Sequence, residues 1–172
     1  PPAVYSELQS LLRRRAVMVA SRTSMLQSWT NEKSMRKAFD GVLKEMAKVD
    51  LLLRKRIKDL LREADLLEQV ERCQAIEGIG FLTATALVMN FIRGDFRNSD
   101  AFIAFLGMDL KVSDSGQHAG RRRLTKRGCS ETRRLLHNAS MSASRTAAWK
   151  GNYEHSRNRG KATTEALVIL AR

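Results

Sequence analysis

The chain has 172 residues, of which 31 are Lys or Arg and 18 are Asp or Glu, so its formal net charge is +13. A basic excess of this size favours a polyanionic partner such as nucleic acid and argues against a small neutral substrate as the only ligand. The hydrophobic share of 43% excludes disorder over most of the chain, and two prolines with ten glycines favour an all-α fold over a sandwich or barrel.

The cysteines and the chain ends also limit the class of protein. Cys73 and Cys129 have no paired spacing, so neither a disulfide scaffold nor a zinc finger is expected, and a reducing, cytoplasmic setting fits best. No apolar run reaches the roughly 18 residues of a membrane span. The sequence starts without Met and stops inside an apolar run at 166–170, so we expect a fragment of a longer protein.

Two long helices are predicted in the first part of the chain. Apolar residues recur every three or four positions over 4–29, and again from Met35 to Leu61. Helices of this length cannot bury both apolar stripes alone, so we expect an antiparallel hairpin or coiled coil. The spacing does not decide between a hairpin within one core and an intermolecular coiled coil, which would make the protein a homo-oligomer.

Composition changes near Cys73, which divides the chain into a helical spacer at 1–72 and a second domain at 73–172. In the second domain, Gly78 and Gly80 flank Ile79 between two predicted helices, a pattern similar to a helix-hairpin-helix. Glycines let the backbone approach a phosphate, and the amides of the following helix attract an anion. A purely structural tight turn is the alternative. Ser99 is the expected N-cap of a short helix that ends near Gly107.

A glycine-containing basic loop is expected over 109–128. Its cations are Lys111, Arg121, Arg122, Arg123, Lys126 and Arg127. A helix with Ser130 as its N-cap, continuing to about Ala148, would add Arg133 and Arg134 to the same basic face. Such a surface can hold a phosphate backbone, although a solvated run of charge is the alternative. Residues 149–160 are expected to form a second basic connector before a last helix capped by Thr163 or Thr164.

Candidate catalytic groups are few. No cluster of acidic, His or Cys residues indicates a metal site, and His118 and His137 are isolated. Ser113 and Ser115 lie directly before the arginine run. A serine can attack a phosphodiester where nearby cations stabilise the developing charge, provided another group accepts its proton. Serines that form turns or bond a phosphate are the plainer interpretation.

Several segments together carry a family resemblance. They are Ala75-Ile76-Glu77-Gly78-Ile79-Gly80 with Thr83-Ala84, Gly94-Asp95-Phe96, Phe105-Leu106-Gly107, Ser115-Gly116, Arg122-Arg123-Leu124-Thr125-Lys126-Arg127-Gly128 and Arg133-Arg134-Leu135-Leu136. In this order and spacing, residues 73–172 resemble the C-terminal domain of the DEDD transposases, insertion-sequence family one-ten. The stretch 105–143 is most similar to the Piv-type invertases that invert pilin genes, and the preceding helices resemble the family's coiled-coil spacer.

The resemblance implies a DNA recombinase. It places a catalytic serine at Ser115, with Ser113 as the fallback, and a divalent metal such as Mg²⁺ on four carboxylates of a separate N-terminal RuvC-like domain. The fragment alone would then be inactive and would hold no cofactor itself. Some family members use a guide RNA. The sequence departs from the family at Cys129, where Asn is usual.

The sequence as a whole predicts a recombinase fragment that binds DNA and supplies a serine nucleophile. Its DNA contacts would be Gly78, Gly80 and the cations of the basic loop and the following helix. Two other function classes fit the same residues. One is a nucleic-acid-binding module without catalysis, and the other is a coiled-coil interaction scaffold.

Overall fold

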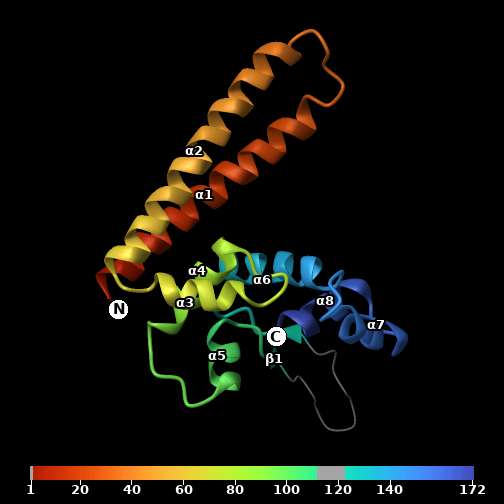
Figure 1. The fold of residues 1–172 in the computed structure, drawn as a ribbon. Coiled ribbons are helices and arrows are strands. Elements are labelled where there is room, and N and C mark those ends of the chain that lie inside the picture. The colour runs from red at the N-terminus through yellow and green to blue at the C-terminus, as the bar shows by residue number, and fades with distance from the viewer. Residues whose placement is uncertain (1, 112–122) are drawn as a thin grey trace. The chain divides into compact units, whose positions relative to one another are not determined.

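A computed structural model describes residues 2–111 and 123–172. These residues divide into two compact units, a helical unit at 2–67 and a C-terminal unit at 68–172. Within the described ranges there are eight helices and one pair of two-residue strands (Figure 1). The predicted all-α fold class is therefore confirmed.

The helical unit is a hairpin of α1 (Ala3–Ser28) and α2 (Arg36–Glu63). The two helices contact each other and run in opposite directions, and they diverge toward the loop that joins them (Figure 1). At that loop the rings of Trp29 and Phe39 stack with centroids 5.2 Å apart. The periodicity of the sequence thus predicted both helices and their antiparallel pairing.

An ion-pair cluster joins the two helices near their middle. Arg15 Nε of α1 lies 2.6 Å from Asp50 Oδ1 of α2, and Arg54 Nε donates a hydrogen bond to Asp50 Oδ2 at 2.8 Å. Burial by itself would raise the pKa of Asp50, but the hydrogen bonds and charges of Arg54 and Arg15 outweigh it and leave the pKa below its usual value. The Asp50 carboxylate is therefore a charged link between α1 and α2.

The C-terminal unit contains all remaining elements. In chain order they are α3 (Leu67–Gln74), α4 (Phe81–Phe91), α5 (Ser99–Phe105), β1 (Leu110–Lys111), β2 (Arg123–Leu124), α6 (Ser130–Ala143), α7 (Lys150–Asn158) and α8 (Thr163–Ala171). Helix α6 packs against α4 and α8, and α8 also packs against α7. Helix α6 thus contacts both α4 and α8, and α7 joins the unit through α8.

The core of this unit lies around Leu106, Met108 and Leu136. A buried polar contact accompanies it, because Asn90 Nδ2 of α4 donates a hydrogen bond to Thr132 Oγ1 of α6 at 3.0 Å. Both side chains are nearly inaccessible, with 2% and 1% of their surface exposed. Buried polar groups are tolerated only when their hydrogen bonds are made. The need to keep this hydrogen bond therefore fixes the register of α4 against α6.

Four phenylalanines form an aromatic cluster beside α5. The Phe96 ring lies 4.9 Å from Phe102 and 5.2 Å from Phe105, measured between centroids, and Phe91 packs against both Phe96 and Phe102. Phe96 belongs to the Gly94-Asp95-Phe96 motif. Its place at the centre of this cluster gives that part of the motif a packing role.

Several predicted helix ends differ from the structure. Asn98, not Ser99, caps α5, and its side chain accepts a hydrogen bond from the Ala101 N–H at 2.9 Å. Ser130 and Thr163 are the first helical residues of α6 and α8, not their N-caps. Neighbouring polar residues have similar cap preferences, so only the backbone geometry selects between them.

The segment after α6 also differs. Helix α6 ends at Ala143 and not near Ala148, and most of the expected connector at 149–160 is helix α7. Only Ser156 of α7 is buried, so the helix has no apolar stripe for periodicity to detect. In the part of the chain that the structure describes, we find no helix with the length and hydropathy to cross a membrane.

Candidate nucleic-acid interface

Two cations face each other across the β1–β2 pair. The strands are antiparallel, with Leu110 opposite Leu124 and Lys111 opposite Arg123. Side chains at directly opposed positions lie about 5 Å apart at Cβ, and like charges there are destabilising. Lys111 and Arg123 are both exposed. A bound anion would offset this repulsion, so the pair indicates an anionic ligand.

Two further cations follow β2 in a tight turn. Lys126 has a φ of +57°, a left-handed conformation that a non-glycine residue rarely adopts. Hydrogen bonds hold the turn: the Thr125 N–H donates to Asp109 O at 3.0 Å, the Thr125 hydroxyl donates to the Asp109 carboxylate, and the Lys126 N–H donates to Gly107 O at 3.1 Å. Lys126 and Arg127 are consequently exposed on a fixed backbone. We call Lys111, Arg123, Lys126 and Arg127 the basic turn.

Two glycines allow this turn to lie directly against the end of α5. A Cβ at Gly107, where φ is +70°, would come within 2.6 Å of the Gly128 nitrogen, and a Cβ at Gly128 would come within 2.4 Å of the Leu106 carbonyl carbon. Real Cβ atoms do not approach so closely. Glycine at both positions is therefore a packing requirement of the basic turn.

Arg133 holds the same contact from α6. Its guanidinium Nη1 donates to Gly128 O at 2.6 Å and to Leu106 O at 3.3 Å. The side chain is half-buried and directed to the backbone on both sides of the glycine contact. Arg133 thus positions the basic turn, which is a different role from the phosphate contact that we predicted for it.

Arg134 has an acidic partner within α6. Its Nε and Nη2 donate to the two carboxylate oxygens of Glu131 at 2.7 and 2.6 Å. The hydrogen bond from Arg134 to Glu131 raises the pKa of Arg134 above its ordinary value. Burial acts in the opposite direction but is the smaller effect. Among the described residues, in contrast, no carboxylate lies within ion-pair distance of the four cations of the basic turn.

The remaining predicted residues of this region are Ser113, Ser115, Arg121 and Arg122. They lie outside the described residues. All four lie within 112–122, the segment that connects Lys111 to Arg123, and both of these flanking residues are described. Their roles stay predictions.

The structure gives Gly78 a packing reason. Its φ is +94°, and a Cβ there would come within 2.6 Å of the Ala143 Cβ, so the turn before α4 lies against the end of α6. A Cβ at Gly80 would meet no atom within 4 Å, and Gly80 is the N-cap residue of α4. Phosphate contact at Gly78 and Gly80 stays a prediction, while close packing already accounts for glycine at 78.

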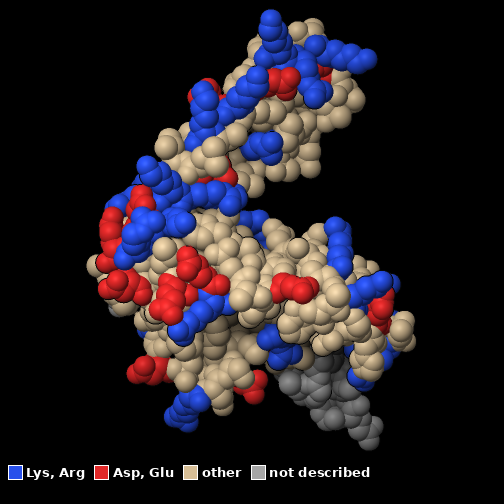
Figure 2. Space-filling model, viewed as in Figure 1, with Lys and Arg blue, Asp and Glu red and all other residues tan. Residues whose placement is uncertain are grey.

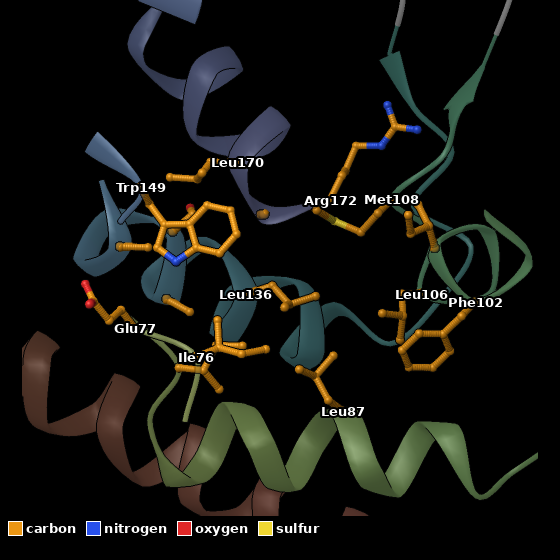
Figure 3. A pocket seen from close by; sticks show the side chains of 16 residues that line it. Ile76, Glu77, Leu87, Phe102, Leu106, Met108, Leu136, Trp149, Leu170 and Arg172 are labelled. Atoms are coloured by element: carbon orange, nitrogen blue, oxygen red, sulfur yellow. The ribbon is translucent and has the colours of Figure 1, made fainter. Parts of the chain in front are cut away.

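An apolar cavity of about 270 Å³ lies within the C-terminal unit. Leu87 of α4, Leu136 of α6, Leu170 of α8 and Trp149, the N-cap residue of α7, face it (Figure 3). The charged ends of Glu77 and Arg172 point away from its centre (Figure 3). A cavity with this lining has no arrangement of acid, base and nucleophile for catalysis, so the basic turn remains the stronger candidate site.

The described ranges, 2–111 and 123–172, offer no site for a metal ion. They contain no group of three or more His, Cys, Asp or Glu side chains that could hold a metal ion. The donor set for Mg²⁺ is thus not found among these residues, and we assign no step to a metal in this chain.

Comparison with protein families matches residues 70–155, half of the chain, to the Transposase IS116/IS110/IS902 family. The chain belongs to this family. The matched range includes α4, α5, both strands and α6, and therefore the whole basic turn. A comparison with curated proteins finds no match. Membership of a transposase family implies DNA as the partner of the protein. The predicted class, a DNA recombinase, is therefore confirmed at the level of the family.

The sequence did not reveal the residues that position the site. Asp109, Thr125 and Arg133 fix the transposase's basic turn through hydrogen bonds, although the sequence marks Thr125 only as a member of a family segment and does not mark Asp109. A usable signal was present for the glycines, because Gly107 and Gly128 each end a segment of the family pattern. Their contact across 20 intervening residues becomes visible only in the tertiary structure.

Proposed function

We propose that the basic turn of this transposase binds the DNA backbone next to the strand-cleavage site. The observation that carries the proposal is the opposed pair Lys111 and Arg123, continued by Lys126 and Arg127, without an acidic partner among the described residues. Phosphate contacts position a protein on DNA without reading its sequence. The turn is thus a positioning element for the reacting strand.

We propose Ser115 as the nucleophile, with Ser113 as the fallback. Its position in the sequence supports this, because 112–122 connects the two facing cations. In the reaction, the serine Oγ forms a bond to phosphorus while the bond from phosphorus to one deoxyribose oxygen breaks. The serine proton passes to a base and the leaving oxygen takes up a proton. The cations would stabilise the negative charge of the transition state.

The finer predictions from the family resemblance are part of this proposal. We propose DNA recombination by inversion or transposition as the reaction, a metal site in a separate domain of the intact protein, and assembly through the helical hairpin. Exposed apolar side chains support the last point, since Val17, Leu51 and Leu52 are 68%, 67% and 66% exposed. A guide RNA is a further partner that the same cations could hold.

The DNA contact can be tested by salt titration. For duplex DNA, log K falls by about 0.9 per log unit of salt for each phosphate contacted. Replacing Lys126 and Arg127 with alanine should lower the slope by about 1.8 if each contacts one phosphate. The matched control is Lys37→Ala with Lys44→Ala, two exposed cations of α2 that remove the same charge. Equal losses in both variants would contradict a specific contact at the turn.

The serine assignment is tested in the intact protein. Recombination in cells should be lost in Ser115→Ala, and a covalent protein–DNA adduct on nicked DNA should disappear with it. Ser113→Ala is the matched control and should retain both. An adduct that persists in Ser115→Ala and disappears in Ser113→Ala would select the fallback residue. DNA binding without any adduct in the wild type would favour a binding module without catalysis.

A further inference from the structure

Basic and acidic residues are unequally distributed in the C-terminal unit. Residues 123–172 contain eleven Lys or Arg and three acidic residues, whereas residues 68–111 contain four Lys or Arg and six acidic residues. Acidic side chains gather over α3 and basic ones over α7 (Figure 2). A polyanion is therefore attracted to the part of the unit formed by β2, α6, α7 and α8.

One exposed face of α6 connects the basic turn to the other end of that region. The exposed residues recur every three or four positions: Ser130, Arg134, Asn138, the neighbours Met141 and Ser142 and, two residues after the helix, Arg145. At 1.5 Å per residue, the 14 residues of α6 span about 21 Å. The face contains one acidic neighbour, Glu131, which is paired with Arg134. Apart from Met141 the face is polar, and its described residues include no unpaired negative charge.

A cleft of about 480 Å³ lies at the far end of this face, where α6, α7 and α8 meet, and its lining includes the apolar side chains of Met141 and Leu167. Arg145, Lys150, Tyr153 and Thr163 contribute to its lining. Lys150 lies 3.6 Å from Glu154, and both side chains are more than half exposed, so this ion pair is weak. Among described residues, Arg145 has no carboxylate partner and the hydroxyls of Tyr153 and Thr163 have no hydrogen-bond partner.

These groups match the chemistry of a phosphodiester. Two cations supply charge, and two hydroxyls can donate hydrogen bonds to phosphate oxygens. The apolar cavity beside Trp149 lacks both properties, and the aromatic cluster around Phe96 lies in the acidic part of the unit. The cleft is consequently the site outside the basic turn where the described residues best fit an anion.

We propose that this cleft is a second contact for the nucleic-acid backbone, and that α6 sets its distance from the basic turn. The inference rests on the proposed function, because it takes the basic turn as the first contact. The length of α6, about 21 Å, corresponds to about six base pairs at 3.4 Å per pair. One duplex lying along the exposed face of α6 would reach both sites.

The test compares three pairs of alanine substitutions in the intact protein bound to duplex DNA. They are Arg145→Ala with Lys150→Ala in the cleft, Lys126→Ala with Arg127→Ala in the turn, and Lys37→Ala with Lys44→Ala as the charge-matched control. The cleft pair should lower the salt slope by about 1.8, as for two phosphates lost. It should also shorten the hydroxyl-radical footprint by about six base pairs at one end, a change that altered net charge alone does not produce.

Each outcome decides the inference separately from the proposed function. If the turn pair loses binding and the cleft pair retains the wild-type slope and footprint, the cleft is excluded while the proposed function stands. If the control lowers the slope as much as the cleft pair, only net charge acts and the inference is wrong. Wild-type protein that does not bind DNA at low salt would contradict both. Tyr153→Phe with Thr163→Val, which leaves the charge unchanged, should weaken binding at the cleft without altering the turn.

Discussion

The Arg133 guanidinium donates a hydrogen bond to the Gly128 carbonyl oxygen at 2.6 Å, and through it α6 holds the basic turn of this transposase against the end of α5. The contact separates two roles that look alike in the sequence. Arg133 maintains the turn, while Lys126 and Arg127 are exposed on it. Removing a positioning arginine and removing a phosphate-binding cation should therefore have different consequences.

Arg133→Ala should destabilise the C-terminal unit. The substitution removes two charge-assisted hydrogen bonds, so the two backbone carbonyls lose the donor that Arg133 supplies. We expect the free energy of unfolding to fall by about 2 kcal/mol. Chemical denaturation would measure it. Arg145→Ala removes an exposed arginine that has no ion-pair partner among the described residues, and it should stay within about 0.5 kcal/mol of the wild type. Equal stability of the two variants would contradict the positioning role.

Gly128→Ala should also be destabilising. Its Cβ would overlap the Leu106 carbonyl, so the turn must move, at a cost of about 1–3 kcal/mol. Gly151→Ala in α7 is the matched control. Its Cβ would meet nothing within 4 Å, and alanine in a helix should raise stability by up to about 1 kcal/mol. Thermal unfolding of both variants would detect the opposite signs, and a neutral Gly128→Ala would disprove the close approach.

Cys129→Asn should stabilise the unit by about 1 kcal/mol. Cys129 is the N-cap residue of α6, with φ −63° and ψ 120°, and its side chain makes no cap hydrogen bond. Asparagine can accept one from the first-turn amides. Asparagine would therefore supply the cap hydrogen bond that Cys129 does not make. Cys129→Ala, which adds no acceptor, should leave the melting temperature nearly unchanged, and an Asn variant that melts no higher than the Ala variant would refute the explanation.

The helical hairpin should lose stability in acid. The pKa of Asp50 is lowered in the folded state, so its contribution is present above the unfolded value near 3.9 and disappears as the pH falls through the lower folded value. Denaturation at a series of pH values would show the loss below about pH 4. Asp50→Asn should flatten that dependence. Glu45→Gln, which removes an exposed carboxylate paired with Lys48, should keep the wild-type profile.

Local patterns were sufficient for elements with strong periodicity. The stripes over 4–29 and 35–61 predicted α1 and α2 because a long amphipathic helix repeats the same signal over several turns. The sequence predicted a basic loop where β1 and β2 lie, because strands of two residues are too short to show an alternating pattern. Helix α7 was missed because only Ser156 faces inward.

The sequence alone determined the all-α class, the excess of positive charge and the family, because each depends on composition, periodicity or motif order. Only the tertiary structure decided which cations are available to DNA. Arg133 and Arg134 are adjacent and chemically identical, yet one binds backbone carbonyls and the other binds Glu131. The Arg134–Glu131 pair is a local contact three residues apart within α6, whereas Arg133 finds its partner at Leu106 only because the packing of α5 and α6 brings them within hydrogen-bond distance.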